Sequence, residues 1–541
     1  MKRARRGSAR FGSTIALLAS VGLAIAACGS SGTAGSSSDA GGNSPGASAS
    51  GNAPDTNQPA STGPASPRKA QNKLIAIAVQ DPGTLDYTKS NLTALALWIP
   101  NIVEPLVYFD ADGQAVPGVS DKWTISDDQK TYSFHIRDTT FSNGAPVTAD
   151  DVVYSLNTMK ASPVTRNATA YSAVTSIKKT DDHTVEVTLS RPSRSFFLGM
   201  GSTSGLIQPK ASASSIATDP IGTGPYKLVK YVPNDSITLT ANTSYWGTKP
   251  AIPDVTIKII PDQNAALNAL KAGEADLFAP AGAQFWSQIT KEGLDKKYHL
   301  ITYPQSGEPT YGVINSRVPE KERQVIAQVF DRDAIKALFN APWGIKTTCT
   351  FGEPNRSWFQ PYSAGSCANP YDPKAAAAAV ASNGYGDQEL EFTSLTDVGD
   401  LKPPAEVMIA EMQAAGFKVK NNAVDLARYS QLVFSAKQPD FDVTVMAGSD
   451  DPTSWACPDK TQVSWSTYCS EKYTSLLAQA DAAASTAEYD KIMKQAMDTL
   501  TRDAVIVPMI SKSGVGLMSP DLQGWQDPNV FVGIRLADLH W

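Results

Sequence analysis

Residues 141–152 read Phe-Ser-Asn-Gly-Ala-Pro-Val-Thr-Ala-Asp-Asp-Val, a turn that leads straight into a helix start. Thr148 can cap this helix, because its side-chain oxygen can accept from a first-turn amide, and two aspartates follow where negative charge is favourable. Short runs rich in β-branched and aromatic residues flank the helix at 132–136 and 184–189. This alternation of strand and helix predicts an α/β fold.

The same two patterns continue along residues 73–541 without a repeat at a fixed period. The predicted strands cover 74–79, 132–136, 184–189, 237–240 and 255–260. One helix is predicted to begin after Thr148. The others cover 266–271, which Asp262 can cap, 374–382 and 404–415, and Gly273, Gly384 and Gly416 lie just beyond their ends.

Length and charge exclude some classes of protein. The 541 residues are enough for two or more lobes with cores of their own. The formal charge is −6, and five basic residues lie within the first ten positions, so removal of residues 1–27 would leave −11. An acidic body lacks the broad positive field that nucleic-acid binding needs, so we expect no nucleic-acid partner.

The N-terminus has the pattern of an export signal. A basic start is followed by an uncharged run of about 17 residues, 11–27, which suits a signal peptide better than a spanning helix. The run ends Ile-Ala-Ala-Cys28-Gly, which resembles the lipobox of bacterial lipoproteins, in which the cysteine receives the lipid. The alternative is a plain signal peptide with an incidental Cys28.

The cysteine count agrees with lipidation of Cys28. Four cysteines remain, which can form two disulfides in an exported protein. Short spacing favours pairing Cys349 with Cys367 and Cys457 with Cys469, although four cysteines allow three connectivities. A four-thiolate zinc site would need tight CxxC pairs, and the sequence has none.

Residues 28–70 are predicted to be a lipidated cysteine followed by a flexible tether. Gly, Ser, Ala, Pro and Thr make up 34 of the 42 residues from 29 to 70, so this segment has too little apolar surface to fold. A flexible chain of this length typically spans about 35 Å. The tether can therefore hold a folded body away from a membrane.

Ordered blocks after the tether carry a resemblance to a known family. They are Asp81-Pro82-Gly83-Thr84-Leu85-Asp86, Glu104-Pro105-Leu106-Val107, Trp123 with Ser126-Asp127-Asp128, residues 131–138, residues 141–152, Gly222-Thr223-Gly224-Pro225-Tyr226, Tyr245-Trp246-Gly247, residues 272–276, Asp331-Arg332, Tyr371-Asp372-Pro373 and residues 503–508. Together they resemble the family 5 solute-binding proteins of ABC importers, which include dipeptide- and oligopeptide-binding proteins.

The resemblance implies a two-lobed, hinged α/β fold like that of type II periplasmic binding proteins, with an extra subdomain. Residues 71–110, 220–310 and 505–541 would form lobe I, 111–219 the extra subdomain on its side, and 311–504 lobe II. Because the last segment returns to lobe I, two strands would form the hinge and restrict the motion to opening and closing.

No catalytic signature appears. HExxH and the phosphate-binding loop are absent, and the nearest approach to a nucleophile elbow, residues 201–205, has Thr203 in the nucleophile position. The four histidines, His135, His183, His299 and His540, are widely spaced. We therefore expect no enzyme, cofactor or metal.

For binding, the informative segment is 441–452, Phe-Asp-Val-Thr-Val-Met-Ala-Gly-Ser-Asp-Asp-Pro, a strand that runs into an acid-rich turn. The family pairs an extended peptide with such a strand edge and bonds its ammonium group to an aspartate three positions before an acid-Pro pair. Here Gly448 occupies that position, so the ammonium role passes to Asp450 or Asp451. The predicted ligand contacts are Met446, Ala447, Gly448, Asp450, Asp451, Trp455 and, from the segment after the first Asp-Pro block, Ser90 and Asn91.

The sequence therefore predicts an exported lipoprotein on the outer face of the cytoplasmic membrane. It would be a monomer that captures short peptides in the cleft between its lobes and delivers them to an ABC permease. Within the same fold, haem, a nickel chelate or an oligosaccharide are alternative ligands. An exported hydrolase and a surface adhesion or sensor protein are the alternatives of another class.

Overall fold

The computed structural model describes residues 67–89, 97–110, 113–162, 164–281, 285–339, 345–351, 361–362, 367–396, 401–433, 439–448, 452–457, 467–526 and 533–541. These residues all belong to one compact unit of the chain. Within them, no helix has both the length and the apolar character that crossing a bilayer requires. The predicted signal peptide, Cys28 and residues 29–66 of the tether lie outside the described ranges.

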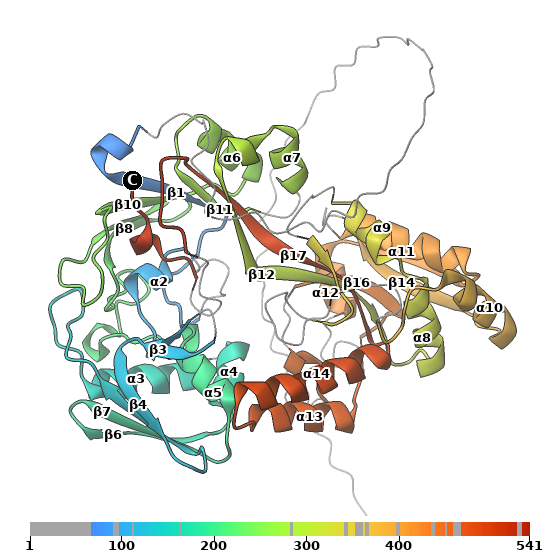
Figure 1. The fold of residues 1–541 in the computed structure, drawn as a ribbon, viewed down its shortest axis with the longest axis horizontal. Helices are drawn as coiled ribbons and strands as arrows, with labels where there is room; N and C mark the ends of the chain where they lie inside the picture. Colours follow the sequence, from blue (N-terminus) through green and yellow to red (C-terminus); the bar gives the residue numbers. More distant parts are fainter. Residues whose placement is uncertain are drawn as a thin grey trace, which may run out of the picture. The chain divides into compact units, whose positions relative to one another are not determined.

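The capped helix predicted first in the sequence covers a four-stranded antiparallel sheet. The order of the sheet is β4 (Ser120–Ile125), β5 (Thr131–Ile136), β7 (Thr184–Leu189) and β6 (Val174–Asp181). Helix α3 (Ala149–Lys160) packs on β6 and β7 (Figure 1). Thr148 and Asp151 form a capping box at its start, as the Thr-x-x-Asp spacing allows. Alternate residues of β5 and β7 are buried beneath it, which explains their period of two.

A second, eleven-stranded sheet runs through most of the described chain. Its path is β15 (Lys418–Val424), β14 (Glu389–Leu395), β16 (Val443–Ala447), β12 (His299–Ile314), β17 (Ile506–Met518), β11 (Leu277–Ala281), β1 (Lys73–Ala78), β10 (Asp254–Ile259), β9 (Ser236–Ala241) and β8 (Tyr226–Val232), and β13 (Ile345–Thr347) pairs with β17. A small third sheet joins β2 (Val107–Phe109) to β3 (Ala115–Pro117).

Two large apolar cores lie at the two ends of the long antiparallel strands β12 and β17. The first core draws most of its side chains from residues 74–257 and 518–539, and the second from residues 311–510. Ile301 and Met518 belong to the first core, whereas Val313 and Ile506 belong to the second. The two long strands therefore connect the cores (Figure 1).

Helices are distributed between these cores and a smaller third cluster, to which α6 and α7 contribute. The α-helices not yet given are α2 (Ile99–Ile102), α4 (Thr165–Tyr171), α5 (Arg194–Met200), α6 (Gln263–Lys271), α7 (Phe285–Lys291), α8 (Glu320–Val329), α9 (Arg332–Ala337), α10 (Pro373–Asn383), α11 (Lys402–Ala414), α12 (Leu426–Val433), α13 (Glu471–Asp481) and α14 (Thr486–Arg502). Short 3₁₀ turns are η1 (Lys69–Gln71), η2 (Thr203–Gly205), η3 (Lys210–Ser212), η4 (Leu294–Lys296), η5 (Pro452–Trp455) and η6 (Leu536–Asp538).

The predicted elements are present, with ends that differ from the prediction by at most three residues, and the strand at 184–189 matches at both ends. Asp262 caps α6 by accepting from the amide of Ala265 at 2.7 Å. Gly384 follows α10 with φ +71°, and Gly416 follows α11 with φ +100°, a region that suits glycine.

The Gly222–Gly224 turn needs glycine for reasons of space, since neither residue has a positive φ. A Cβ on Gly222 would lie 2.2 Å from the carbonyl oxygen of Ile102, and one on Gly224 would lie 2.7 Å from the Ile102 carbonyl. Close backbone approach therefore excludes a side chain at both positions.

Candidate functional site

Strand β16, the predicted ligand strand, is an interior strand of the large sheet. It pairs antiparallel with β12 along its whole length, from Ile314 opposite Val443 to Thr310 opposite Ala447. On its other side it pairs with β14 only at Val443 and Thr444. Most of this strand is therefore already paired, which limits the edge that is left for a ligand.

The free part of the edge begins at Ala447. Ile314, which lies opposite Val443, donates its N–H away from β16 to the carbonyl of Val505. Antiparallel pairing alternates, so Thr444 and Met446 direct their N–H and C=O groups toward β12. Val445 and Ala447 direct theirs toward the other edge. Among the described residues, the C=O of Val445 accepts from the hydroxyl of Tyr429 at 3.0 Å, whereas no strand pairs beside Ala447.

Gly448 ends the strand in a conformation that favours glycine. Its φ is +141°, and a Cβ built there would meet nothing within 4 Å. Backbone conformation rather than lack of space therefore disfavours a side chain. The predicted anchors Asp450 and Asp451 follow in the sequence and lie outside the described residues.

An aromatic cluster supports β16 from one face. Met446 is buried opposite Tyr311 of β12. The Tyr311 ring meets the rings of Phe351 and Trp455 edge-to-face, at centroid distances of 5.0 and 6.2 Å. Trp455 is 1% exposed and packs in the second core, so its predicted ligand contact stays a prediction.

The structure pairs the four described cysteines in the way that short spacing favours. Cys349 bonds to Cys367, and Cys457 bonds to Cys469. Phe351 follows the first of these cysteines by two residues, and Trp455 precedes Cys457 by two. Both bridges therefore restrain segments that supply rings to the cluster beneath β16.

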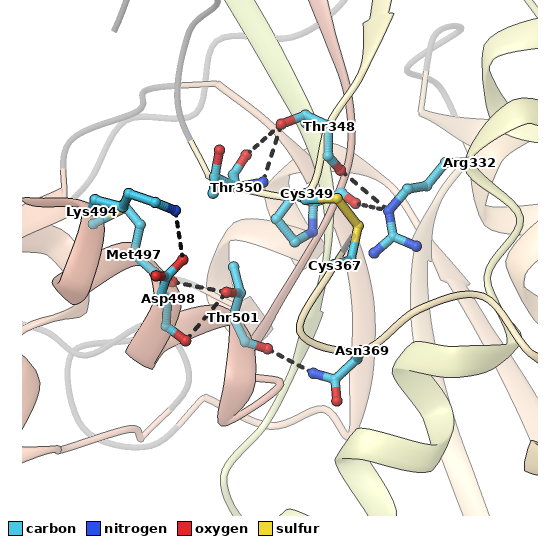
Figure 2. The surroundings of a disulfide bond; sticks show 11 residues. Arg332, Thr348, Cys349, Thr350, Cys367, Asn369, Lys494, Met497, Asp498 and Thr501 are labelled. Atoms are coloured by element: carbon cyan, nitrogen blue, oxygen red, sulfur yellow. Dashed lines mark hydrogen bonds and ion pairs between the residues drawn. A yellow bond between two sulfur atoms is a disulfide. The ribbon is translucent and has the colours of Figure 1, made fainter. Parts of the chain in front are cut away.

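Figure 2 shows the surroundings of the Cys349–Cys367 bridge. Arg332 Nε donates to the carbonyl oxygens of Thr348 at 3.2 Å and Pro508 at 2.8 Å. Burial lowers the pKa of this guanidinium to about 10. Asn369 donates to the carbonyl of Thr501 at 2.7 Å, which ties the segment after Cys367 to the last turn of α14.

The second predicted contact segment starts at Tyr87. Tyr87 is fully buried in the first core, and the Asp86 carboxylate accepts from Thr88 and pairs with Lys89 at 2.8 Å. Burial alone would raise the pKa of Asp86, but the Lys89 and Thr88 bonds outweigh it and lower the pKa. The structure thus shows a folded turn leading toward Ser90 and Asn91, which lie outside the described residues.

Sequence reasoning missed Tyr311, Phe351 and Tyr429. Tyr429 lies with Leu432 and Val433 on the buried face of α12, and this spacing predicts burial. The spacing does not predict that the Tyr429 hydroxyl donates to the Val445 carbonyl, because that hydrogen bond joins two different elements. In the described part of the chain, no group of three or more His, Cys, Asp or Glu side chains could hold a metal ion.

Comparison with known proteins decides the family. The profile of the bacterial extracellular solute-binding proteins, family 5 (middle region), matches residues 114–464. This chain is a family 5 solute-binding protein. Proteins of this family are binding components of transport systems rather than enzymes.

Two curated relatives of this solute-binding protein show the range of ligands. The probable di/tripeptide-binding protein 5 of Pseudomonas aeruginosa is 26% identical over 475 residues, which are 79% of this chain and 87% of the relative. The heme-binding protein A of Haemophilus influenzae is 24% identical over 469 residues, which are 78% of this chain and 84% of the relative.

A solved structure confirms the fold class. The ABC transporter substrate-binding protein CtaP of Listeria monocytogenes matches with a TM-score of 0.74 and 23% identity, over 86% of this chain and 99% of its own. The solute-binding protein thus has the two-lobed α/β fold that the sequence predicts.

Proposed function

We propose that this solute-binding protein captures short peptides outside the cytoplasmic membrane and delivers them to an ABC permease. Family membership supports a binding role in transport, and the relative from P. aeruginosa bears the name of a di/tripeptide-binding protein. The observation that carries the peptide assignment is the edge of β16 at Ala447, where, among the residues that the structure describes, no strand pairs with the main chain, and the acidic residues Asp450 and Asp451 follow closely in the sequence.

This edge suits a peptide because main-chain pairing is independent of side chains. A peptide laid along Ala447 would bond through its own backbone, and its ammonium group would meet Asp450 or Asp451. A charge-assisted hydrogen bond contributes about 1.5–3 kcal/mol, or roughly ten- to a hundredfold in affinity.

The proposal includes the division of the chain into lobes. Residues 71–110, 220–310 and 505–541 form lobe I, 111–219 the extra subdomain and 311–504 lobe II. The second core, drawn from residues 311–510, and the two strands that leave it support this division. Closure of the lobes around a ligand would couple binding to a change of shape.

Isothermal calorimetry with dipeptides, tripeptides and their N-acetylated forms tests the ligand class. We expect the free-amine peptides to bind, and acetylation to weaken binding at least tenfold. Saturable binding of haem or a nickel chelate, with no peptide binding, would assign the alternative ligand class that heme-binding protein A represents.

The anchor is tested by Asp450→Asn and Asp451→Asn. We expect one of them to weaken free-amine peptides about ten- to a hundredfold and to leave acetylated peptides unchanged. Asp490→Asn, on α14, is the matched control. Unchanged affinity in both loop variants would place the anchor elsewhere.

The lipid anchor is proposed at Cys28, on the lipobox-like residues before it and the tether after it. Mass spectrometry of protein extracted from membranes should show a diacylglyceryl mass on an N-terminal Cys28. Cys28→Ser should release the protein from the membrane fraction. A Cys28→Ser protein that stays membrane-bound would contradict lipid anchoring.

A further inference from the structure

A polar contact joins the two cores at a place distant in sequence from the hinge strands. Helix α5 belongs to the first core, in which Phe196 and Met200 are buried. Helices α13 and α14 belong to the second, through Tyr473 and Met497 among others. The start of α5 lies against the α13–α14 hairpin (Figure 1).

Asp481, the last residue of α13, makes most of this contact. Its carboxylate accepts from the backbone N of Ser195 at 2.8 Å and from the Ser193 hydroxyl at 3.2 Å. Its other oxygen accepts from Arg191 Nη1 at 2.5 Å. The Ser195 amide is in the first turn of α5, where no acceptor exists inside the helix, so Asp481 supplies a partner from the other core.

A second set of contacts lies beside the first. Arg194 donates to the Thr486 hydroxyl at 2.9 Å, and its guanidinium lies 5.0 Å from the ring centroid of Tyr489. Burial first, and then the charge of Asp481, raise the pKa of Tyr132 to about 12. Asp481 is only 15% exposed, whereas Arg191 is 49% exposed.

The chain itself crosses between the cores in β12 and β17. Their pairing is irregular between Tyr303 and Glu308 and again between Thr310 and Tyr311. Irregular pairing weakens the ladder locally, so bending is easiest there. A contact on the α5 side resists such bending, because the cores cannot separate while Asp481 holds the start of α5.

We propose that Asp481, with Arg191, Ser193 and Ser195, forms a latch that holds the two cores together and must break before they swing apart. The latch stabilises the closed state relative to open forms, whether or not a ligand is present. Its loss therefore shifts the population toward open forms and lowers the apparent affinity for any ligand that requires closure.

Small-angle scattering of the ligand-free protein tests the latch without reference to the ligand. Asp481→Asn and Arg191→Gln should each increase the radius of gyration, and the double variant should add little to Asp481→Asn, because both remove the same contact. Asp490→Asn, the same change on the neighbouring helix, should leave the scattering unchanged. Circular dichroism verifies that every variant is folded.

The affinity for a ligand is the second quantity to measure. For a ligand identified by calorimetry, Asp481→Asn should weaken binding about fivefold, mainly through faster dissociation. A radius of gyration equal to that of the wild type in both latch variants would overturn the proposal. Failure of all peptides to bind would overturn the peptide assignment but not the latch, which the ligand-free scattering decides alone.

Discussion

Glu104 is a fully buried carboxylate that accepts four hydrogen bonds from side chains. One oxygen accepts from the hydroxyls of Tyr108 at 3.0 Å and Tyr245 at 2.9 Å, and the other accepts from Thr223 at 2.8 Å and Trp246 Nε1 at 2.7 Å. Complete burial raises its pKa despite these donors. The carboxylate joins β2, the Gly222–Gly224 turn and the segment after β9 into one network.

Replacement of Glu104 should show how much this network contributes to the free energy of unfolding. Glu104→Leu leaves four donors without this acceptor, three of them buried, and we expect a loss of about 3–5 kcal/mol in unfolding free energy. Glu104→Gln keeps one oxygen for Trp246 and Thr223, and the tyrosine hydroxyls can accept from its amide, so about 1 kcal/mol should be lost. Urea unfolding compares the two. Equal stability of the Leu and Gln variants would contradict this account.

Glu411 predicts a dependence of stability on pH. Burial first, and then the charge of Asp331, raise its pKa to about 8, although the Asp331 amide donates to it. The folded state then holds the proton more tightly than the unfolded state. The stability from this group is therefore complete below about pH 4.5 and is lost as pH rises toward 8.

Glu411→Gln resembles the protonated form at every pH. We expect the unfolding free energy of the wild type, relative to this variant, to fall between pH 5 and pH 9. Glu406→Gln, at an exposed position of the same helix, should show a constant difference. Urea unfolding at pH 5, 7 and 9 makes the measurement, and parallel curves for the wild type and Glu411→Gln would rule out the raised pKa.

At the scale of elements, Arg68 docks the start of the described chain onto the large sheet. Its guanidinium donates to the Asp276 carboxylate at 2.6 and 2.8 Å and to the carbonyl of Gly273 at 2.8 Å. Asp276 is 1% exposed and also accepts from the Ile75 amide. One carboxylate thus holds η1, β1 and the start of β11 together.

Asp276→Asn should weaken the attachment of η1 and β1 to the start of β11. We expect a loss of about 2–4 kcal/mol, because the buried amide cannot accept all three donors. Amide hydrogen exchange should accelerate at residues 68–76. Lys69→Gln, which removes a half-exposed lysine 4.0 Å from Asp521, should change stability by less than about 0.5 kcal/mol. Similar effects of the two substitutions would contradict the role of Asp276.

At the scale of the whole molecule, the two cores and their connection predict a response to ligand. Two long strands and the Asp481 latch connect the cores in the described structure. A ligand that binds the closed form should shift the population further toward it. Scattering with saturating peptide should therefore give a smaller radius of gyration than without it, most clearly in Asp481→Asn. Identical curves with and without a bound ligand would argue against closure.

Local sequence predicted the elements well, whereas the ligand site that it indicates stays a prediction. The Thr148 cap, the strand at 184–189 and the glycine after α10 depend on nearest neighbours along the chain, and all are present. Sequence reasoning placed the ligand on the edge of β16, but it could not show that β14 and Tyr429 occupy most of that edge. Such contacts join residues far apart in the chain.

The caps and the period-two strands follow from the amino-acid sequence, because each depends on residues only a few positions apart. The order of motifs along the chain predicted the family, whereas the export signal at the N-terminus stays a prediction. The tertiary structure decided three features: the burial of Trp455, the hydrogen bond from Tyr429 to the Val445 carbonyl, and the contact of Asp481 with α5. The physical reason is that burial and hydrogen-bond partners depend on which distant segments pack together, and no local pattern records that.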